Sequence, residues 1–167
     1  MKSLLSLASM LVVGLMATPS FAQTAKEGSI STTYASYGTL KPVPVGKDRL
    51  LVTFDENGLT VGQGIIDHMT WHCWGMGDYT NGVGEGRGSC VATDPGGDQI
   101  VAEFADSEKH APDQKSWNGA AKFTTGTGKY VGISGGFTYV IHGNEFRSAA
   151  EGTYTNYATN QGSYKLP

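Results

Sequence analysis

The chain has 167 residues, a formal net charge of −3 and 24 glycines. Its length suits one domain that can bury a core, and its slightly acidic charge argues against nucleic acid or an anionic membrane as a partner. Glycine disfavours helix interiors and serves turns and bulges, so its abundance argues against a helical protein and favours an all-β fold.

Residues 1–22 have the pattern of a cleaved signal peptide. A positive residue, Lys2, precedes an apolar stretch at 4–16 that is too short to span a bilayer, and small residues precede the expected cleavage before Gln23. We therefore expect a soluble bacterial protein that a Sec-type signal exports to the periplasm or the medium, without membrane insertion. Residues 23–167 then form a single β-barrel domain.

Alternating apolar residues predict the first strands of that domain. We expect strands over 30–40 and 49–55, joined by an extended connection at 41–45 whose prolines cannot donate to a sheet. Asn57 and Gly58 form an Asn-Gly pair beside alternating segments, which predicts a hairpin turn after the second strand.

Residues 65–74 are the longest strand candidate, and their alternation divides ten side chains between two faces. One face carries Ile65, Asp67, Met69, Trp71 and Cys73. The other carries Ile66, His68, Thr70, His72 and Trp74. The pattern alone leaves open which of these faces points into the protein.

The second half of the domain continues as short strands separated by turns. A strand over 83–93 leads to a tight turn at 94–97, where proline and glycine supply the required backbone angles. A strand over 99–104 follows, and the polar residues 105–116 predict the longest loop. Further strands are expected at 117–124, 136–142, 147–157 and 162–166, with a turn at 126–128. No alternation of strands with helices is visible, so we expect a single antiparallel β-barrel of about eight strands.

The two cysteines, Cys73 and Cys90, are expected to form one disulfide, because paired cysteines in an exported chain are usually oxidised. Their spacing lacks the Cys-x-x-Cys pattern of metal-binding or redox pairs. A loop of this size implies about 3 kcal/mol of stabilisation. The disulfide would act as a staple between neighbouring strands.

Residues 126–139, GTGKYVGISGGFTY, resemble the glycine-rich strand motif of the allene oxide cyclase and dirigent barrel superfamily. The resemblance implies a calycin-like, eight-stranded antiparallel barrel with an apolar mouth, and assembly into homotrimers. It also implies activities that steer or catalyse the cyclisation and coupling of small apolar or phenolic molecules. Cyclases of this group use a carboxylate and a bound water, but no motif here matches around any acid, so no catalytic residue is carried over.

Two acids within predicted strands, Asp67 and Glu103, are candidate catalytic residues. A charged side chain that points into a barrel is costly unless it is paired, so such a residue either faces outward or has a function. If Trp71 faces inward, Asp67 shares its face and becomes a candidate base. No nucleophile motif, phosphate loop or dinucleotide fingerprint is visible, so the sequence leaves open whether the protein is an enzyme.

Aromatic residues are the candidates for a ligand pocket, because ring side chains suit apolar or aromatic ligands. The candidates are Trp71, Trp74, His72, Tyr130 and Tyr139. Trp71 and Trp74 have opposite strand parity, so we expect one in the core and the other near a mouth or a subunit contact. Plain core packing explains these residues equally well.

No cofactor or metal is expected. His68 and His72 share a strand face but would lie roughly 13 Å apart at ~3.3 Å per residue, too far to bind one ion together. Asp94 and Asp98 flank the turn at 94–97 and are the candidates for calcium, although their spacing does not match an EF-hand loop. Turn chemistry alone accounts for Asp94.

Three functions remain open: an exported barrel that binds a small apolar or aromatic molecule, an isomerase or cyclase, and an oligomeric interaction protein of the envelope. An interior acid with a raised pKa beside a pocket favours the enzyme. A wide apolar interior without ionisable groups favours binding, and a filled interior with a flat apolar exterior patch favours assembly.

Overall fold

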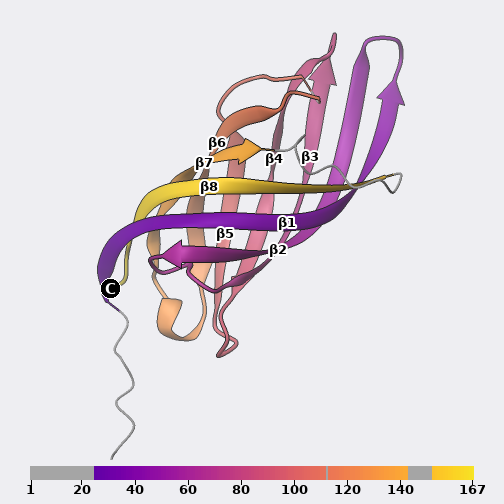
Figure 1. The fold of residues 1–167 in the computed structure, drawn as a ribbon. Coiled ribbons are helices and arrows are strands. Elements are labelled where there is room, and N and C mark those ends of the chain that lie inside the picture. The colour runs from indigo at the N-terminus through magenta and orange to yellow at the C-terminus, as the bar shows by residue number, and fades with distance from the viewer. Residues whose placement is uncertain (1–24, 112, 143–151) are drawn as a thin grey trace, which may run out of the picture.

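The computed structural model describes residues 25–111, 113–142 and 152–167. Within them, eight antiparallel strands pair in chain order and close into a barrel, with β1 and β8 side by side at the closure (Figure 1). The strands are β1 (Glu27–Val45), β2 (Arg49–Gln63), β3 (Thr70–Thr80), β4 (Val83–Thr93), β5 (Gln99–Asp106), β6 (Ser116–Gly126), β7 (Ser134–His142) and β8 (Thr153–Lys165). The expected all-β barrel is confirmed. The expected signal peptide, residues 1–22, and positions 147–151 of the strand expected at 147–157 lie outside the described residues.

Side chains alternate between the interior and the exterior along the strands, as closure of a sheet requires. On β1, Ile30, Thr32 and Tyr34 are buried while the residues between them are exposed. A short 3₁₀ helix, η1 (Gly128–Tyr130), connects β6 to the turn before β7. No helix of the described residues is both long and apolar enough to cross a membrane.

The hairpin turn expected at Asn57-Gly58 is wrong, because β2 runs through both residues. The β1–β2 turn lies at 46–48 instead, where Gly46 takes a positive φ of 69°. The segment 41–45, expected to be a connection, forms the end of β1. Proline is tolerated there because the described pairing of β1 with β8 ends at Thr39, so among the described residues no β8 ladder needs an N–H from Pro42 or Pro44.

Gly58 is required by packing rather than by a turn. A Cβ at this position would lie 2.2 Å from Cε2 of Tyr34 and 2.6 Å from the carbonyl oxygen of Ala35. We predict that Gly58→Ala lowers the free energy of unfolding by about 1–3 kcal/mol, because the Tyr34 ring must move. Asn57→Ala, at the exposed neighbouring position, is the control and should change it by less than about 0.5 kcal/mol. Urea denaturation measures both values, and equal losses would contradict a continuous strand.

The strand expected at 65–74 begins only at Thr70, and residues 64–69 form a turn. His68 has a positive φ of 56°, and its backbone N–H donates to the carbonyl of Thr60 at 2.9 Å. Ile66 and Met69 are fully buried. The apolar residues that suggested a strand therefore fold under one end of the barrel, and this turn breaks the alternation that linked Asp67 to Trp71.

One end of the barrel is filled by a hydrophobic plug. It combines the turn at 64–69 with η1, the start of β1 and the C-terminus, and its buried members include Ile30, Ile66, Met69, Tyr130, Ile133 and Leu166. The strand ends that carry these residues lie together because β1 and β8 are antiparallel and Glu27 pairs with Lys165. The space inside the barrel that the plug does not fill lies nearer the opposite end.

Candidate functional site

A cavity of about 510 Å³ lies inside the barrel and is lined by residues of all eight strands. It exists because several inward positions on β3 and β4 are glycine. Gly75 and Gly88 have no side chains, so the rings of Phe54 and Phe104 lie against the backbone there. These two rings contact each other, with centroids 6.0 Å apart. Elsewhere in the cavity wall, the ring of Trp71 makes edge-to-face contacts with Tyr34 and Phe137, with centroid distances of 6.4 and 6.1 Å.

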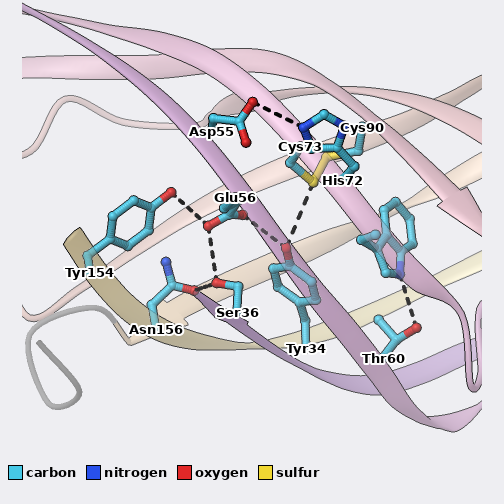
Figure 2. Close-up of a disulfide and its surroundings, with 11 residues drawn as sticks. Tyr34, Ser36, Asp55, Glu56, Thr60, His72, Cys73, Cys90, Tyr154 and Asn156 are labelled. Atoms are coloured by element: carbon cyan, nitrogen blue, oxygen red, sulfur yellow. Dashed lines mark hydrogen bonds and ion pairs between the residues drawn. A yellow bond between two sulfur atoms is a disulfide. The ribbon is translucent and has the colours of Figure 1, made fainter. Parts of the chain in front are cut away.

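Glu56 of β2 projects into this cavity and is the centre of a polar cluster (Figure 2). The hydroxyl of Tyr34 donates to Oε1 at 3.1 Å. The hydroxyls of Tyr154 and Ser36 donate to Oε2 at 2.8 and 3.1 Å. Oγ of Ser36 also lies 2.8 Å from Oδ1 of Asn156. Strands β1, β2 and β8 thus bring hydroxyl groups together around one carboxyl group.

Burial raises the pKa of Glu56 above its usual range, because the ionised form loses its hydration inside the barrel. Hydrogen bonds from Tyr154, Ser36, Tyr34 and Asn156 favour the ionised form but only partly offset this effect. The carboxyl group therefore holds its proton to a higher pH than an exposed glutamate does.

A second polar cluster centres on Asp106 at the end of β5. Its Oδ2 accepts from the backbone N–H of Gly86 at 2.6 Å and lies 3.0 Å from Nε2 of His110. Its Oδ1 accepts from the hydroxyl of Tyr139 at 3.1 Å. The loop after β5 brings His110 to this place, because two backbone hydrogen bonds join His110 to Gly84 of β4.

The surroundings of His110 favour the imidazolium form of its ring. Nε2 faces the carboxyl group of Asp106, and Nδ1 lies 3.0 Å from the carbonyl oxygen of Ala111, so both contacts suit a ring that donates from both nitrogens. Burial alone would lower the pKa of His110, but these hydrogen bonds and the negative charge of Asp106 raise it. The ring also stacks on Trp117 at a centroid distance of 4.6 Å. Asp106 and His110 form a buried ion pair in the cavity wall.

The expected disulfide between Cys73 and Cys90 is confirmed. The two cysteines are direct partners on β3 and β4, and both side chains face the cavity. Cys73 is also the partner of Glu56 in the β2–β3 register. The hydroxyl of Tyr34 lies 3.9 Å from Sγ of Cys73, so the disulfide borders the Glu56 cluster (Figure 2).

The two acids predicted as catalytic candidates lie outside the cavity. Asp67 is in the turn at 64–69, where it accepts from the backbone N–H of Gly62 at 2.8 Å and pairs with His68 at 2.8 Å. Glu103 is exposed on the outer face of β5. Asp67 was expected to share a face with Trp71 because both were placed in one continuous strand. The turn at 64–69 interrupts that strand, so the expectation does not hold.

The five predicted pocket residues separate into three places. Trp71 and Tyr139 line the cavity. His72 and Trp74 lie on the outer face of β3 beside an external groove, and the Trp74 side chain is 42% exposed. Tyr130 is buried in η1, where its hydroxyl donates to Oδ2 of Asp94 at 3.1 Å. The inward face of β3 is thus the one with Trp71 and Cys73.

Asp94 and Asp98, the calcium candidates, serve the turns at the plugged end. Asp94 accepts from the backbone N–H groups of Gly96 and Asp98, and Nζ of Lys129 lies 2.5 Å from its Oδ2. Asp98 accepts from the backbone N–H of Lys129 at 3.2 Å. The lysine ammonium group stands where a bound cation would be. No group of three or more His, Cys, Asp or Glu side chains among the described residues could hold a metal ion.

Glu56, Asp106 and His110 were not among the residues that the sequence singled out. Glu56 was expected beside the Asn57-Gly58 turn, and Asp106 and His110 were both expected in the loop at 105–116. One signal was present, because Glu56 continues the alternation of Val52 and Phe54 and therefore shares their inward face. No pattern predicts the contact of His110 with Gly84.

Comparison with known proteins gives no match, either to a protein-family model or to a curated protein. The function has to be inferred from the cavity and the side chains around it.

Proposed function

We propose that the protein binds a small, largely apolar or aromatic molecule inside the barrel. The observation that carries this proposal is the cavity of about 510 Å³, which aromatic rings line and the hydrophobic plug closes at one end. Ligand pockets are typically concave, mostly apolar and about 300–1,000 Å³ in volume, with a few convergent polar groups. Glu56 and its hydroxyl donors supply such groups.

Two further observations agree with a binding barrel in an oxidising compartment. The signal-peptide pattern of residues 1–22 supports export to the periplasm or medium, and a disulfide is typical of proteins there. The resemblance of residues 126–139 to the allene oxide cyclase and dirigent motif supports a small apolar or phenolic ligand.

We predict that Ala121→Phe abolishes binding of a neutral fluorescent probe, N-phenyl-1-naphthylamine. Ala121 lines the cavity between its register partners Phe104 and Phe137, so a phenyl ring there occupies the space that the probe needs. The apparent Kd should rise by at least about tenfold. Fluorescence titration of the purified protein measures it.

Ala120→Phe is the matched control, because Ala120 is the preceding residue on β6 and is exposed on the outer face. It should bind the probe as the unmodified protein does, and thermal denaturation should show that both variants are folded. Equal binding by all three proteins would place the probe outside the cavity and contradict the proposal.

An isomerase or cyclase is the second candidate function, favoured by the buried carboxyl group of Glu56. Its raised pKa and its place in an apolar cavity are features of carboxyl groups that act in acid–base catalysis. The test is incubation with an extract of apolar metabolites from the source organism, followed by mass spectrometry. Products of unchanged mass that form with the unmodified protein but not with Glu56→Gln support catalysis, and their absence contradicts it.

A further inference from the structure

The described residues that line the cavity include more acidic than basic side chains. Among the described residues that line it, the ionisable groups other than tyrosine are Glu56, Asp106 and His110. Asp106 and His110 pair with each other, and their side chains are only 6% and 2% exposed. Glu56 has hydroxyl partners but makes no ion pair with any described basic side chain. Among the described residues of the cavity wall, no basic side chain therefore pairs with the carboxyl group of Glu56.

The surroundings of Glu56 act on its ionisation in two opposite directions. The hydroxyls of Tyr34 and Tyr154 point at the carboxyl oxygens and would stabilise a carboxylate. Burial opposes ionisation and is the stronger effect, since the pKa of Glu56 is raised. A positive charge brought into the cavity would favour the carboxylate, because it would offset the cost of burying a negative charge.

The rest of the wall suits a positive charge and provides no attraction for a negative one. Aromatic rings attract cations over their faces, and Trp71, Phe54 and Phe137 line the same cavity. The imidazolium of His110 is already neutralised by Asp106. An anionic ligand would meet Glu56 without any free basic group among the described residues that line the cavity.

We propose that the natural ligand is an amine, in which an apolar or aromatic body carries a protonated amino group that pairs with Glu56. This inference rests on the proposed binding function and adds the ligand class. The ammonium group enters with its proton, and the carboxyl group of Glu56 releases to solvent the proton that it carries at any pH below its own pKa. Binding then leaves one new ion pair in the cavity and, at such a pH, releases a proton to solution.

Other titratable groups near Glu56 keep their protonation state during this step. Burial raises the pKa values of Tyr34, Tyr154 and Tyr139 well above their usual range, so all three stay neutral. Cys73 is in the disulfide. Asp55, the neighbour of Glu56 on β2, faces outward and pairs with His72, and the Asp106–His110 pair is common to every variant compared below.

The test uses three probes with one ring system: 2-naphthylmethylamine, 2-naphthylmethanol and 2-naphthoate. Isothermal titration calorimetry of the purified full chain, in buffers with different ionisation enthalpies, gives the affinity and the protons released. We expect the amine to bind at least about tenfold more tightly than the alcohol, the naphthoate to bind most weakly, and about one proton to be released per amine at pH values below the Glu56 pKa.

Glu56→Gln separates the charge from the shape of the site. In this variant the amine should bind no more tightly than the alcohol and should release no proton, and thermal denaturation should show that the barrel is folded. If the alcohol binds as tightly as the amine to the unmodified protein, the amine inference is overturned and the binding function stands. If none of the three probes binds, the binding function fails and the inference fails with it.

Discussion

Replacing Asp106 with alanine is expected to lower the free energy of unfolding by about 3–5 kcal/mol, because it leaves a buried charge without its partner. Among the described residues, Asp106 is the side-chain partner of the His110 ring nitrogen Nε2, and it also accepts from Gly86 and Tyr139. The variant leaves these donors buried without an acceptor. Urea denaturation followed by circular dichroism measures the loss.

Asp55→Ala is the matched control for this prediction. The distance between Asp55 and His72 is 3.1 Å, close to the 3.0 Å between Asp106 and His110. Both side chains of the Asp55–His72 pair, however, are about half exposed. Water replaces the lost contact there, so the expected loss is below about 1 kcal/mol. Similar losses in the two variants would show that burial of the Asp106–His110 pair does not contribute.

The pH dependence gives a second measure of the same ion pair. The pKa of His110 is raised in the folded protein above its unfolded value of about 6.5. The stabilisation is therefore fully present below about pH 6.5 and is lost as the pH rises through the folded pKa. The difference in free energy of unfolding between the unmodified protein and Asp106→Ala should shrink over this range. The titration of Glu56 occurs in both proteins and does not enter the difference.

Removing the disulfide by the double substitution Cys73→Ala and Cys90→Ala is expected to cost about 3 kcal/mol of stability. The two cysteines are 17 residues apart, and the cross-link limits the conformations of the unfolded β3–β4 hairpin. The denaturation midpoint in urea should fall, while the far-ultraviolet spectrum of the barrel should remain.

Reduction of the unmodified protein supplies the control for the disulfide prediction. Dithiothreitol should lower the stability of the unmodified protein toward that of the double variant and should leave the double variant unchanged. An unmodified protein that is equally stable with and without its disulfide would contradict the prediction.

The interior of this barrel is not arranged for stability alone. Large apolar side chains at the inward positions would bury more apolar surface and add stability. Glycine and alanine stand at several of these positions instead and leave a cavity, which Glu56, Asp106 and His110 face. Buried charges are weak contributors to stability and cluster at functional sites. Glu56 and the Asp106–His110 pair are therefore the natural targets for functional experiments.

The sequence by itself determined the fold class and the disulfide. Alternation along strands, abundant glycine and turn residues are local patterns, and they predicted an antiparallel barrel of about eight strands, as the structure shows. Cys73 and Cys90 were the only two cysteines, so their pairing needed no tertiary information.

Only the tertiary structure decided where the strands bend and which polar groups meet inside. Asn57-Gly58 has the local pattern of a turn, but β2 continues because Gly58 lies against Tyr34 of β1. Residues 64–69 have the pattern of a strand, but their apolar side chains gain more burial as a plug. The cluster at Glu56 depends on the register of three strands, and the ion pair of His110 depends on where a loop crosses β4. Such contacts join residues far apart in the chain, so no local pattern contains them.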